Sequence, residues 1–193
     1  MDNHNSNNNQ IFYKSGGGDE QYTPRKTVEV LLPYIQHLKD KIIWCPFDRD
    51  DSQFVKVLRN NGFTVINSHI DYGQDFFEYE PEKWDVIISN PPYKNKRSYW
   101  ERCLHFNKPF ASLLPLNILS DSIINVTMKN RENEFQLLIP NKRTKFYNAL
   151  TGEVGNSPTF KASYFGVNIF NDRLILADLE SDKKNVNLWE DLD

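Results

Sequence analysis

The sequence predicts an α/β fold in which a doubly wound, mostly parallel sheet carries helices on both faces. Short apolar runs of strand type alternate with patterns of helical spacing. The chain has 193 residues, of which 39% are hydrophobic and 13% aromatic. This is enough to bury one sizeable core and too little for two ordinary domains. We therefore expect a single globular domain.

The two ends of the chain differ in composition from its middle. Residues 1–20 are rich in Asn, Ser and Gly, which predicts a flexible arm. Residues 179–193 carry many acids and predict an acidic tail. The folded domain is expected to span 21–178. It begins with Thr23 and Pro24, which match an N-cap and a first helical residue, so we expect a helix over about 24–38.

Six apolar runs define the expected sheet. Four of them predict strands that alternate with helices, at 42–45, 64–67, 84–89 and 110–114. The helical pattern after the first strand closes at Gly62. Two further runs, 163–167 and 174–177, predict a C-terminal antiparallel hairpin. Only four residues separate Ile70 from Asp75, which leaves no room for another helix and strand, so the sheet is expected to lack one edge strand.

Charge and hydropathy argue against two classes of protein, membrane proteins and tight non-specific nucleic-acid binders. The formal net charge of −3 argues against tight non-specific binding to nucleic acids. Two local stretches could still form a basic surface, and they contain Lys94, Lys96, Arg97 and Arg102, and Lys142, Arg143 and Lys145. No apolar run reaches the roughly 18 residues of a membrane span, and no signal segment opens the chain. A cytoplasmic protein without a membrane partner is expected.

The cysteines do not suggest a metal site. Cys45 and Cys103 lie in strand-like and helix-like surroundings, without the spacing of metal ligands. We expect two buried free thiols, with no disulfide and no bound metal.

Asn90-Pro91-Pro92-Tyr93 directly follows a predicted buried strand and is the most informative motif. The exocyclic amine of a base is a weak nucleophile, because its lone pair is delocalised into the ring. The Asn90 side-chain oxygen and a carbonyl of the Pro91-Pro92 segment could accept its two hydrogens, and proline holds that carbonyl in place beforehand. Tyr93 offers a flat face on which an extruded base can stack.

This motif resembles motif IV of the class I amino-methyltransferases, especially the adenine-N6 group with NPPY or DPPY. The resemblance implies a Rossmann-like fold, S-adenosylmethionine as cofactor and DNA, or else RNA, as substrate. Tyr22 and Thr23 resemble the N-terminal motif that helps bind the methionine end of the cofactor. Asp75 and Phe76 resemble the acidic-aromatic motif, in which the acid bonds the adenine amine and the ring packs on the adenine.

Two stretches depart from the family pattern. The family has a Gly-rich loop after the first strand, whereas residues 45–52 contain no glycine. Asp48 is the candidate there for a contact with the cofactor's amino group or its ordered water, and Asp50 could equally cap the next helix. After the second strand, the family's acid for the ribose hydroxyls is replaced by His69 or Asp71.

Other functions remain open from the same residues. The same amine-activating motif serves RNA base methyltransferases and enzymes that modify a glutamine amide in proteins. The basic residues and the candidate stacking rings Phe146 and Phe165 favour a base. The glycine-free loop leaves open an inactive binding protein with a methyltransferase fold. Because the chain has no room for a target-recognition domain, sequence discrimination is expected to be weak or supplied by a partner protein.

Overall fold

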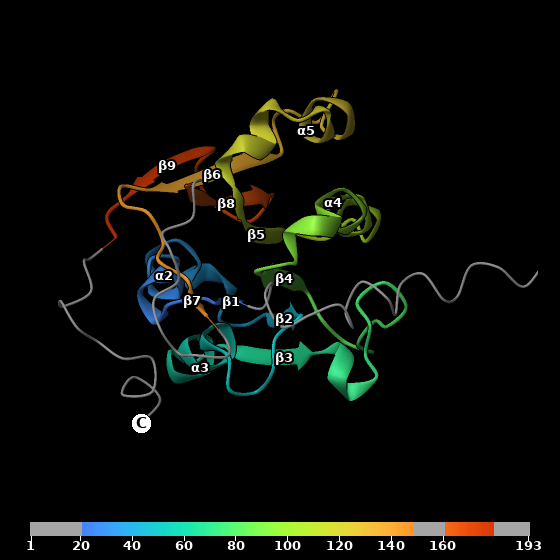
Figure 1. The fold of residues 1–193 in the computed structure, drawn as a ribbon, viewed down its shortest axis with the longest axis vertical. Coiled ribbons are helices and arrows are strands. Elements are labelled where there is room, and N and C mark those ends of the chain that lie inside the picture. The colour runs from blue at the N-terminus through green and yellow to red at the C-terminus, as the bar shows by residue number, and fades with distance from the viewer. Residues whose placement is uncertain (1–20, 149–160, 180–193) are drawn as a thin grey trace, which may run out of the picture.

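The computed structural model describes residues 21–148 and 161–179, which form a seven-stranded mixed sheet in the order β3-β2-β4-β5-β8-β6-β9 (Figure 1). The expectations for the arm at 1–20 and for 180–193 of the tail lie outside the described residues. The sheet strands are β2 (Ile42–Pro46), β3 (Thr64–Ser68), β4 (Val86–Ser89), β5 (Phe110–Pro115), β6 (Phe135–Pro140), β8 (Ala162–Val167) and β9 (Leu174–Ala177).

All seven strands except β8 run in the same direction. β2 pairs in parallel with β3 and β4, β4 with β5, and β6 with β9, whereas β8 is antiparallel to both β5 and β6. A separate two-stranded ribbon joins β1 (Gln21–Tyr22) to β7 (Tyr147–Asn148). The predicted fold class, Rossmann-like and mostly parallel, is confirmed.

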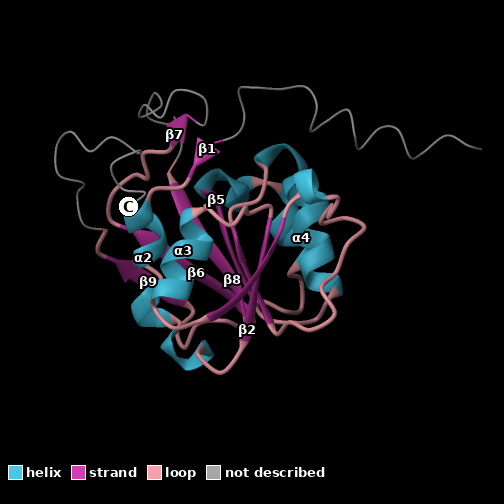
Figure 2. Ribbon diagram, turned by 90° about the horizontal axis from the view of Figure 1, so that it is seen from below, coloured by secondary structure: helices cyan, strands magenta, loops and turns pink. Residues whose placement is uncertain are grey.

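Helices cover both faces of the sheet. In the view along the sheet, α2 (Arg25–Glu29) and α3 (Gln53–Asn60) lie on one side, and α4 (Lys96–His105) lies on the other (Figure 2). α5 (Ser122–Thr127) follows β5 and adds Ile123 and Ile124 to the core on the α4 side. Two hydrophobic cores result. One packs the α2 and α3 side of the sheet, and the other is an aromatic-rich core on the α4 side.

The expected helix over 24–38 is wrong in its length. α2 ends at Glu29, and the chain continues as two short 3-10 helices, Leu32–Tyr34 and Gln36–Leu38. Pro33 lies in the middle of the expected helix, where it has no N–H to donate and its ring crowds the carbonyl four residues earlier. The helix after β2 is confirmed, since Ser52 caps α3 and Gly62 follows its end with a φ of 80°.

The expected C-terminal hairpin is also wrong in its pairing. β8 and β9 run in opposite directions, but β6 lies between them and pairs with both. β6 was not predicted from the sequence, although its Phe135-Gln136-Leu137-Leu138-Ile139 run has strand-like composition. The missing edge strand is confirmed, because residues 69–85 contain only the 3-10 helix Ile70–Tyr72 and turns.

The thiols of Cys45 and Cys103 are free and buried, one in each core. Burial raises the pKa of both thiols, and Asp48 adds to the effect at Cys45. Within 21–148 and 161–179, no group of three metal-binding side chains comes together. None of the helices in these ranges is long and apolar enough to cross a bilayer.

Candidate active site

The carboxyl ends of the parallel strands meet at one edge of the sheet, where an open α/β sheet binds its ligands. β2 ends at Pro46, β3 at Ser68 and β4 at Ser89. The Ser89 hydroxyl donates to the Pro46 carbonyl at 2.6 Å, which joins the ends of β4 and β2. The loops that begin at these strand ends carry Asp48, His69 and Asn90.

Asn90 is held by Thr23, which comes from a segment 67 residues earlier in the chain. The Asn90 amide Nδ2 donates to Thr23 Oγ1 at 3.1 Å. The other end of the amide, Oδ1, is buried and accepts no hydrogen bond. Thr23 therefore does not cap α2, whose N-cap is Pro24 without a side-chain bond. The contact leaves Asn90 with a fixed amide and one unused acceptor.

The rest of the motif turns sharply away from β4. Pro91 is buried and Pro92 is exposed, and Pro92 caps a 3-10 helix over Tyr93–Asn95. The Pro92 carbonyl accepts the Asn95 N–H at 3.4 Å. Tyr93 is half-buried, and burial raises the pKa of its hydroxyl, so this phenol stays protonated. The motif thus provides a neutral, half-buried aromatic ring three residues after Asn90.

Asp48 is a buried carboxyl in the loop after β2. It is 8% exposed, and its Oδ2 atom accepts no hydrogen bond. Desolvation raises the pKa of Asp48 from 3.8 to about 8, while the Ser52 hydroxyl opposes this shift. A buried acid of this kind is mostly neutral at pH 7. A cationic group placed against Oδ2 would favour the ionised form.

Phe47 adopts the backbone conformation that the missing glycine would have supplied. Its φ is 69°, in the left-handed region that costs an ordinary residue about 1–2 kcal/mol. The Phe47 ring packs 5.0 Å from the ring of Phe76 and 5.8 Å from that of Tyr99, measured between centroids. Packing of the ring offsets the backbone strain, so the loop makes its turn without a glycine.

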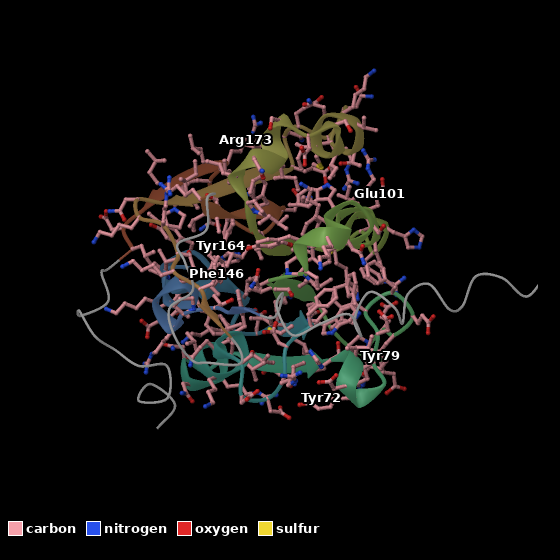
Figure 3. All side chains as sticks on the ribbon, viewed as in Figure 1. Tyr72, Tyr79, Glu101, Phe146, Tyr164 and Arg173 are labelled. Atoms are coloured by element: carbon pink, nitrogen blue, oxygen red, sulfur yellow. The ribbon has the colours of Figure 1, made fainter. Side chains whose placement is uncertain are left out.

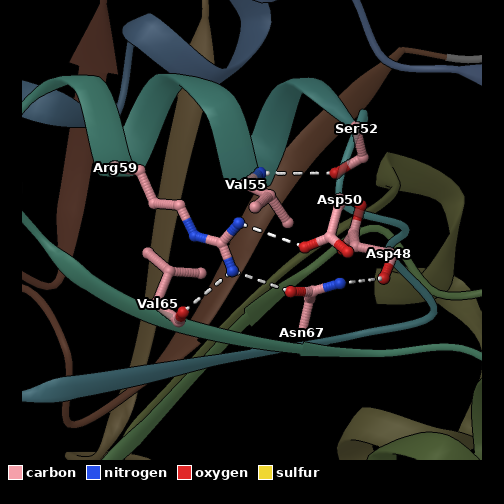
Figure 4. A network of polar contacts seen from close by, with 7 residues as sticks. All are labelled: Asp48, Asp50, Ser52, Val55, Arg59, Val65 and Asn67. Atoms are coloured by element: carbon pink, nitrogen blue, oxygen red, sulfur yellow. Dashed lines mark hydrogen bonds and ion pairs between the residues drawn. The ribbon is translucent and has the colours of Figure 1, made fainter.

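A polar network fixes the loop between β2 and α3 (Figure 4). Arg59 of α3 donates to Asp50 Oδ1 at 3.1 Å and to Asn67 Oδ1 at 2.9 Å. Asn67 in turn donates to the Asp48 carbonyl at 3.2 Å. Asp50 was an alternative cap for the helix, but Ser52 is the cap and Asp50 is the partner of Arg59. The backbone around Asp48 is therefore held from α3 and β3.

At the end of β3, His69 and Asp71 already have structural partners. His69 Nδ1 accepts the Asp71 N–H at 3.1 Å and caps the 3-10 helix. The Arg49 guanidinium lies 2.6 Å from Asp71 Oδ2 and lowers the pKa of that carboxyl. The contact of Arg49 with Asp71 ties the loop after β2 to the loop after β3.

Phe76 lies against the loop after β2, and Asp75 precedes it in the chain. Asp75 Oδ1 accepts the Phe77 N–H at 3.0 Å, so its carboxylate shapes its own turn. Phe76 is 2% exposed and packs among Trp44, Phe47 and Tyr99. The two loops are thus in contact through the rings of Phe47 and Phe76.

The side chains of 21, 22, 147 and 148 are not described, so the expected contact of Tyr22 stays a prediction. Phe146 and Phe165 were candidate stacking rings, but both are buried, with exposed fractions of 3% and 0%. Phe146 and Tyr164, both labelled in Figure 3, are buried and belong to the core on the α2 and α3 side. Neither phenylalanine presents a face to a ligand, so Tyr93 is the stacking candidate that the motif retains.

Tyr164 is a residue near the site that sequence reasoning missed. Its hydroxyl donates to the Thr27 carbonyl at 2.7 Å. Burial raises the pKa of this hydroxyl, and the nearby Tyr93 and Asp48 add to the effect. It comes from β8, whose pairing with β5 joins segments about 50 residues apart. The local sequence does not distinguish it, because a strand tyrosine near a site and one in any other part of the core have the same local pattern.

Three comparisons place this architecture among known proteins. No family model matches the sequence, and no curated protein matches it significantly. A solved structure from Listeria monocytogenes, a candidate class I S-adenosylmethionine-dependent methyltransferase, superposes with a TM-score of 0.52 at 14% identity. The match covers 89% of this chain and 70% of that one.

Two further structures align less well. A dimethyladenosine transferase from Plasmodium falciparum has a TM-score of 0.47 at 12% identity, over 77% of this chain and 62% of its own. A protein-(glutamine-N5) methyltransferase from Alicyclobacillus acidocaldarius has a TM-score of 0.40 at 13% identity, over 75% and 93%. On the first match, the chain has the fold of a class I S-adenosylmethionine-dependent methyltransferase.

Proposed function

We propose that this protein transfers the methyl group of S-adenosylmethionine to the exocyclic amine of a nucleic-acid base, with adenine N6 in DNA as the acceptor. The observation that carries the proposal is the buried Asn90 Oδ1, which has no hydrogen-bond partner. An unpaired buried acceptor costs about 1–3 kcal/mol, so such atoms are rare unless a ligand uses them. A base amine offers the donor that this oxygen lacks.

In this proposal, each residue of the motif has a separate role toward the amine or its base. Asn90 Oδ1 accepts one N–H, and the Pro91 carbonyl accepts the other, since the Pro92 carbonyl already bonds Asn95. Both acceptors favour a pyramidal nitrogen, whose lone pair is then available for attack. Thr23 Oγ1 receives the Asn90 Nδ2 hydrogen and so keeps Oδ1 directed away from it. Tyr93 stacks on the base.

The loops after β2 and β3 suit the proposed cofactor. S-adenosylmethionine supplies an electrophilic methyl group on a cationic sulfonium and also carries an ammonium group. The buried Asp48 Oδ2 offers an unused acceptor for such a cation. Asp75 is proposed for the adenine amine, and His69 or Asp71 for the ribose. Phe76, also expected at the adenine, is 2% exposed among Trp44, Phe47 and Tyr99, so its role is to support the loop after β2. Thr23 and Tyr22 are proposed at the methionine end, where Thr23 could serve both the cofactor and Asn90.

The experiment follows tritiated methyl transfer from S-adenosylmethionine to DNA and to RNA, with nucleoside mass spectrometry to identify the product. N6-methyladenine in DNA is the expected product. Asn90→Ala should reduce the rate by about a hundred- to a thousandfold at saturating cofactor. Asn90→Asp keeps an acceptor oxygen and should retain more activity.

Asn61→Ala is the matched control, because it also removes one side-chain hydrogen bond, from Nδ2 to the Val57 carbonyl, at the far end of α3. It should leave the rate unchanged. A wild-type protein that binds no S-adenosylmethionine in calorimetry, even with nucleic acid present, would overturn the proposal. Methylation of a glutamine amide in place of any base would reassign the acceptor.

A further inference from the structure

The two basic stretches of the chain differ in whether their cations have partners within the protein. In the first stretch, Lys96 pairs with Asp121 at 2.6 Å, and Arg97 pairs with Glu101 at 3.1 Å. The Arg102 guanidinium stacks over the ring of Phe106, 4.8 Å from its centroid. These cations are neutralised or packed within the protein, so they offer little to a partner.

The second stretch keeps its charges in solvent. Lys142, Arg143 and Lys145 are exposed, and within the described part of the chain none of them forms an ion pair. Residues 141–148 contain no acid, so this loop carries three positive charges. On a protein of net charge −3, such a loop is a local exception.

The loop is anchored by the residues that alternate with its cations. Asn141 bonds Asp178 and the Leu179 N–H, at 2.7 and 2.9 Å. Thr144 is 2% exposed and accepts from the Thr27 hydroxyl at 3.3 Å, while Phe146 is buried in the core. The cations therefore project from a backbone that is fixed at both ends, which lowers the entropy that binding would cost.

The loop also lies at the edge of the sheet that carries Asn90. It begins at the carboxyl end of β6, which is three strand positions from β4, or about 14 Å at the usual strand spacing. It then continues into β7, which pairs with β1, and β1 leads directly to Thr23 (Figure 1). The same loop thus joins the strand ends to the segment that holds Asn90.

We infer that Lys142, Arg143 and Lys145 form a docking surface for the phosphate backbone of the nucleic-acid substrate. The inference rests on the proposed function, because it names the partner of the same site. Three fixed cations near the amine-activating residues would hold a strand so that one base can reach Asn90. Contacts of this kind are independent of base sequence, so the loop would position a strand without selecting its sequence.

The test measures the binding of fluorescent DNA duplexes, single strands and RNA by anisotropy across a range of salt concentrations. The loop variant carries Lys142→Gln, Arg143→Gln and Lys145→Gln. It should lower the slope of log affinity against log salt by about 2 to 3. A charge-preserving variant, Lys142→Arg with Lys145→Arg, should keep the wild-type slope.

The matched control carries Lys41→Gln, Lys83→Gln and Lys129→Gln. These exposed lysines precede β2, β4 and β6 at the opposite edge of the sheet, and their loss changes the net charge by the same three units. The control should keep the wild-type slope. An equal loss in the control, or an unchanged slope in the loop variant, overturns the inference.

Binding is measured without methyl transfer, so the two proposals fail separately. Salt-dependent binding through the loop without any methylation removes the proposed activity and leaves the docking surface. A different outcome is a loop variant that binds DNA like the wild type and still methylates free nucleosides. It would remove the docking surface and leave the proposed activity. Circular dichroism and calorimetry with S-adenosylmethionine check that each variant is folded.

Discussion

Two regions beside β2 differ in how their polar atoms are satisfied. On the α4 side, an aromatic cluster surrounds Trp44, whose indole N–H donates to Ser68 at 2.9 Å. The Tyr99 hydroxyl in this cluster bonds Ser112 at 2.7 Å. At the carboxyl edge, in contrast, Asn90 Oδ1 and Asp48 Oδ2 are buried with no partner. Arg102 Nε in the cluster is also buried without a hydrogen-bond partner, but its guanidinium stacks on Phe76 and Phe106. The unused acceptors of these two regions therefore lie at the carboxyl edge.

The difference separates a region that stabilises the fold from the region proposed to bind the ligands. A buried acceptor without a partner costs free energy of folding, and the packed aromatic rings supply free energy that offsets it. The two regions are in contact, since Phe47 precedes Asp48 and packs on Phe76 in the cluster. The cluster can therefore hold the strained loop that carries Asp48.

The largest effect on stability is expected from Trp44→Ala. Trp44 is fully buried and lies 5.1 to 6.4 Å from the rings of Phe76, Tyr79, Trp84 and Phe106. The substitution should lower the free energy of unfolding by about 3–5 kcal/mol, measured by urea denaturation. Asn90→Ala should change it by less than about 1 kcal/mol, because it also removes an unsatisfied oxygen. Equal losses in both variants would contradict the comparison.

Asp48 should make stability depend on pH. The pKa of Asp48 is raised from 3.8 to about 8 in the folded state. Between pH 3.8 and pH 8, the folded protein therefore holds a proton on Asp48 that the unfolded chain has lost. The free energy of unfolding contributed by Asp48 therefore falls as pH rises through this window and levels off above it. Asp48→Asn should gain stability over the wild type between pH 5 and pH 8, by up to about 4 kcal/mol, because each pH unit between the two pKa values is worth about 1.4 kcal/mol. Urea denaturation of both proteins at pH 5 and at pH 8 measures this gain. The prediction is refuted if the free energies of unfolding of the variant and the wild type differ by the same amount at both pH values.

The same carboxyl should link cofactor binding to pH. If Asp48 meets a cationic group of S-adenosylmethionine, the affinity should rise up to about tenfold per pH unit below a pKa of about 8. Calorimetry between pH 6 and pH 8.5 measures the slope, which should vanish in Asp48→Asn. A slope that persists in this variant would mean that another group takes up the proton.

The smallest effect separates two buried threonines of the same segment. Thr23→Val removes the acceptor of the Asn90 amide, whereas Thr27→Val removes only the donor to Thr144. Loss of one hydrogen bond is worth about 1 kcal/mol, so Thr23→Val should lower kcat by about five- to tenfold, with recovery in Thr23→Ser. Thr27→Val should leave kcat unchanged. A weaker cofactor affinity in Thr23→Val, at constant kcat, would instead mean that Thr23 binds the cofactor directly.

Local patterns in the sequence were sufficient for β2 to β5, for α3 and for the position of the motif at residues 90–93. Alternation of apolar runs and turns depends on neighbouring residues, so β2, β3, β4 and β5 could be recognised without the fold. Asn90-Pro91-Pro92-Tyr93 could be placed at a strand end for the same reason. The short path from Ile70 to Asp75 also predicted that an edge strand is absent, because chain length limits what can be built.

Only the tertiary structure decided which polar atoms are partnered. The bond between Asn90 and Thr23 joins residues 67 positions apart, and β6 enters between β8 and β9 although it precedes both in the chain. The burial of Phe146 and Phe165 and the pairing of the first basic stretch likewise depend on contacts between distant segments. The sequence records that a residue is polar, but whether its oxygen is used by the fold or left for a ligand depends on how those segments pack.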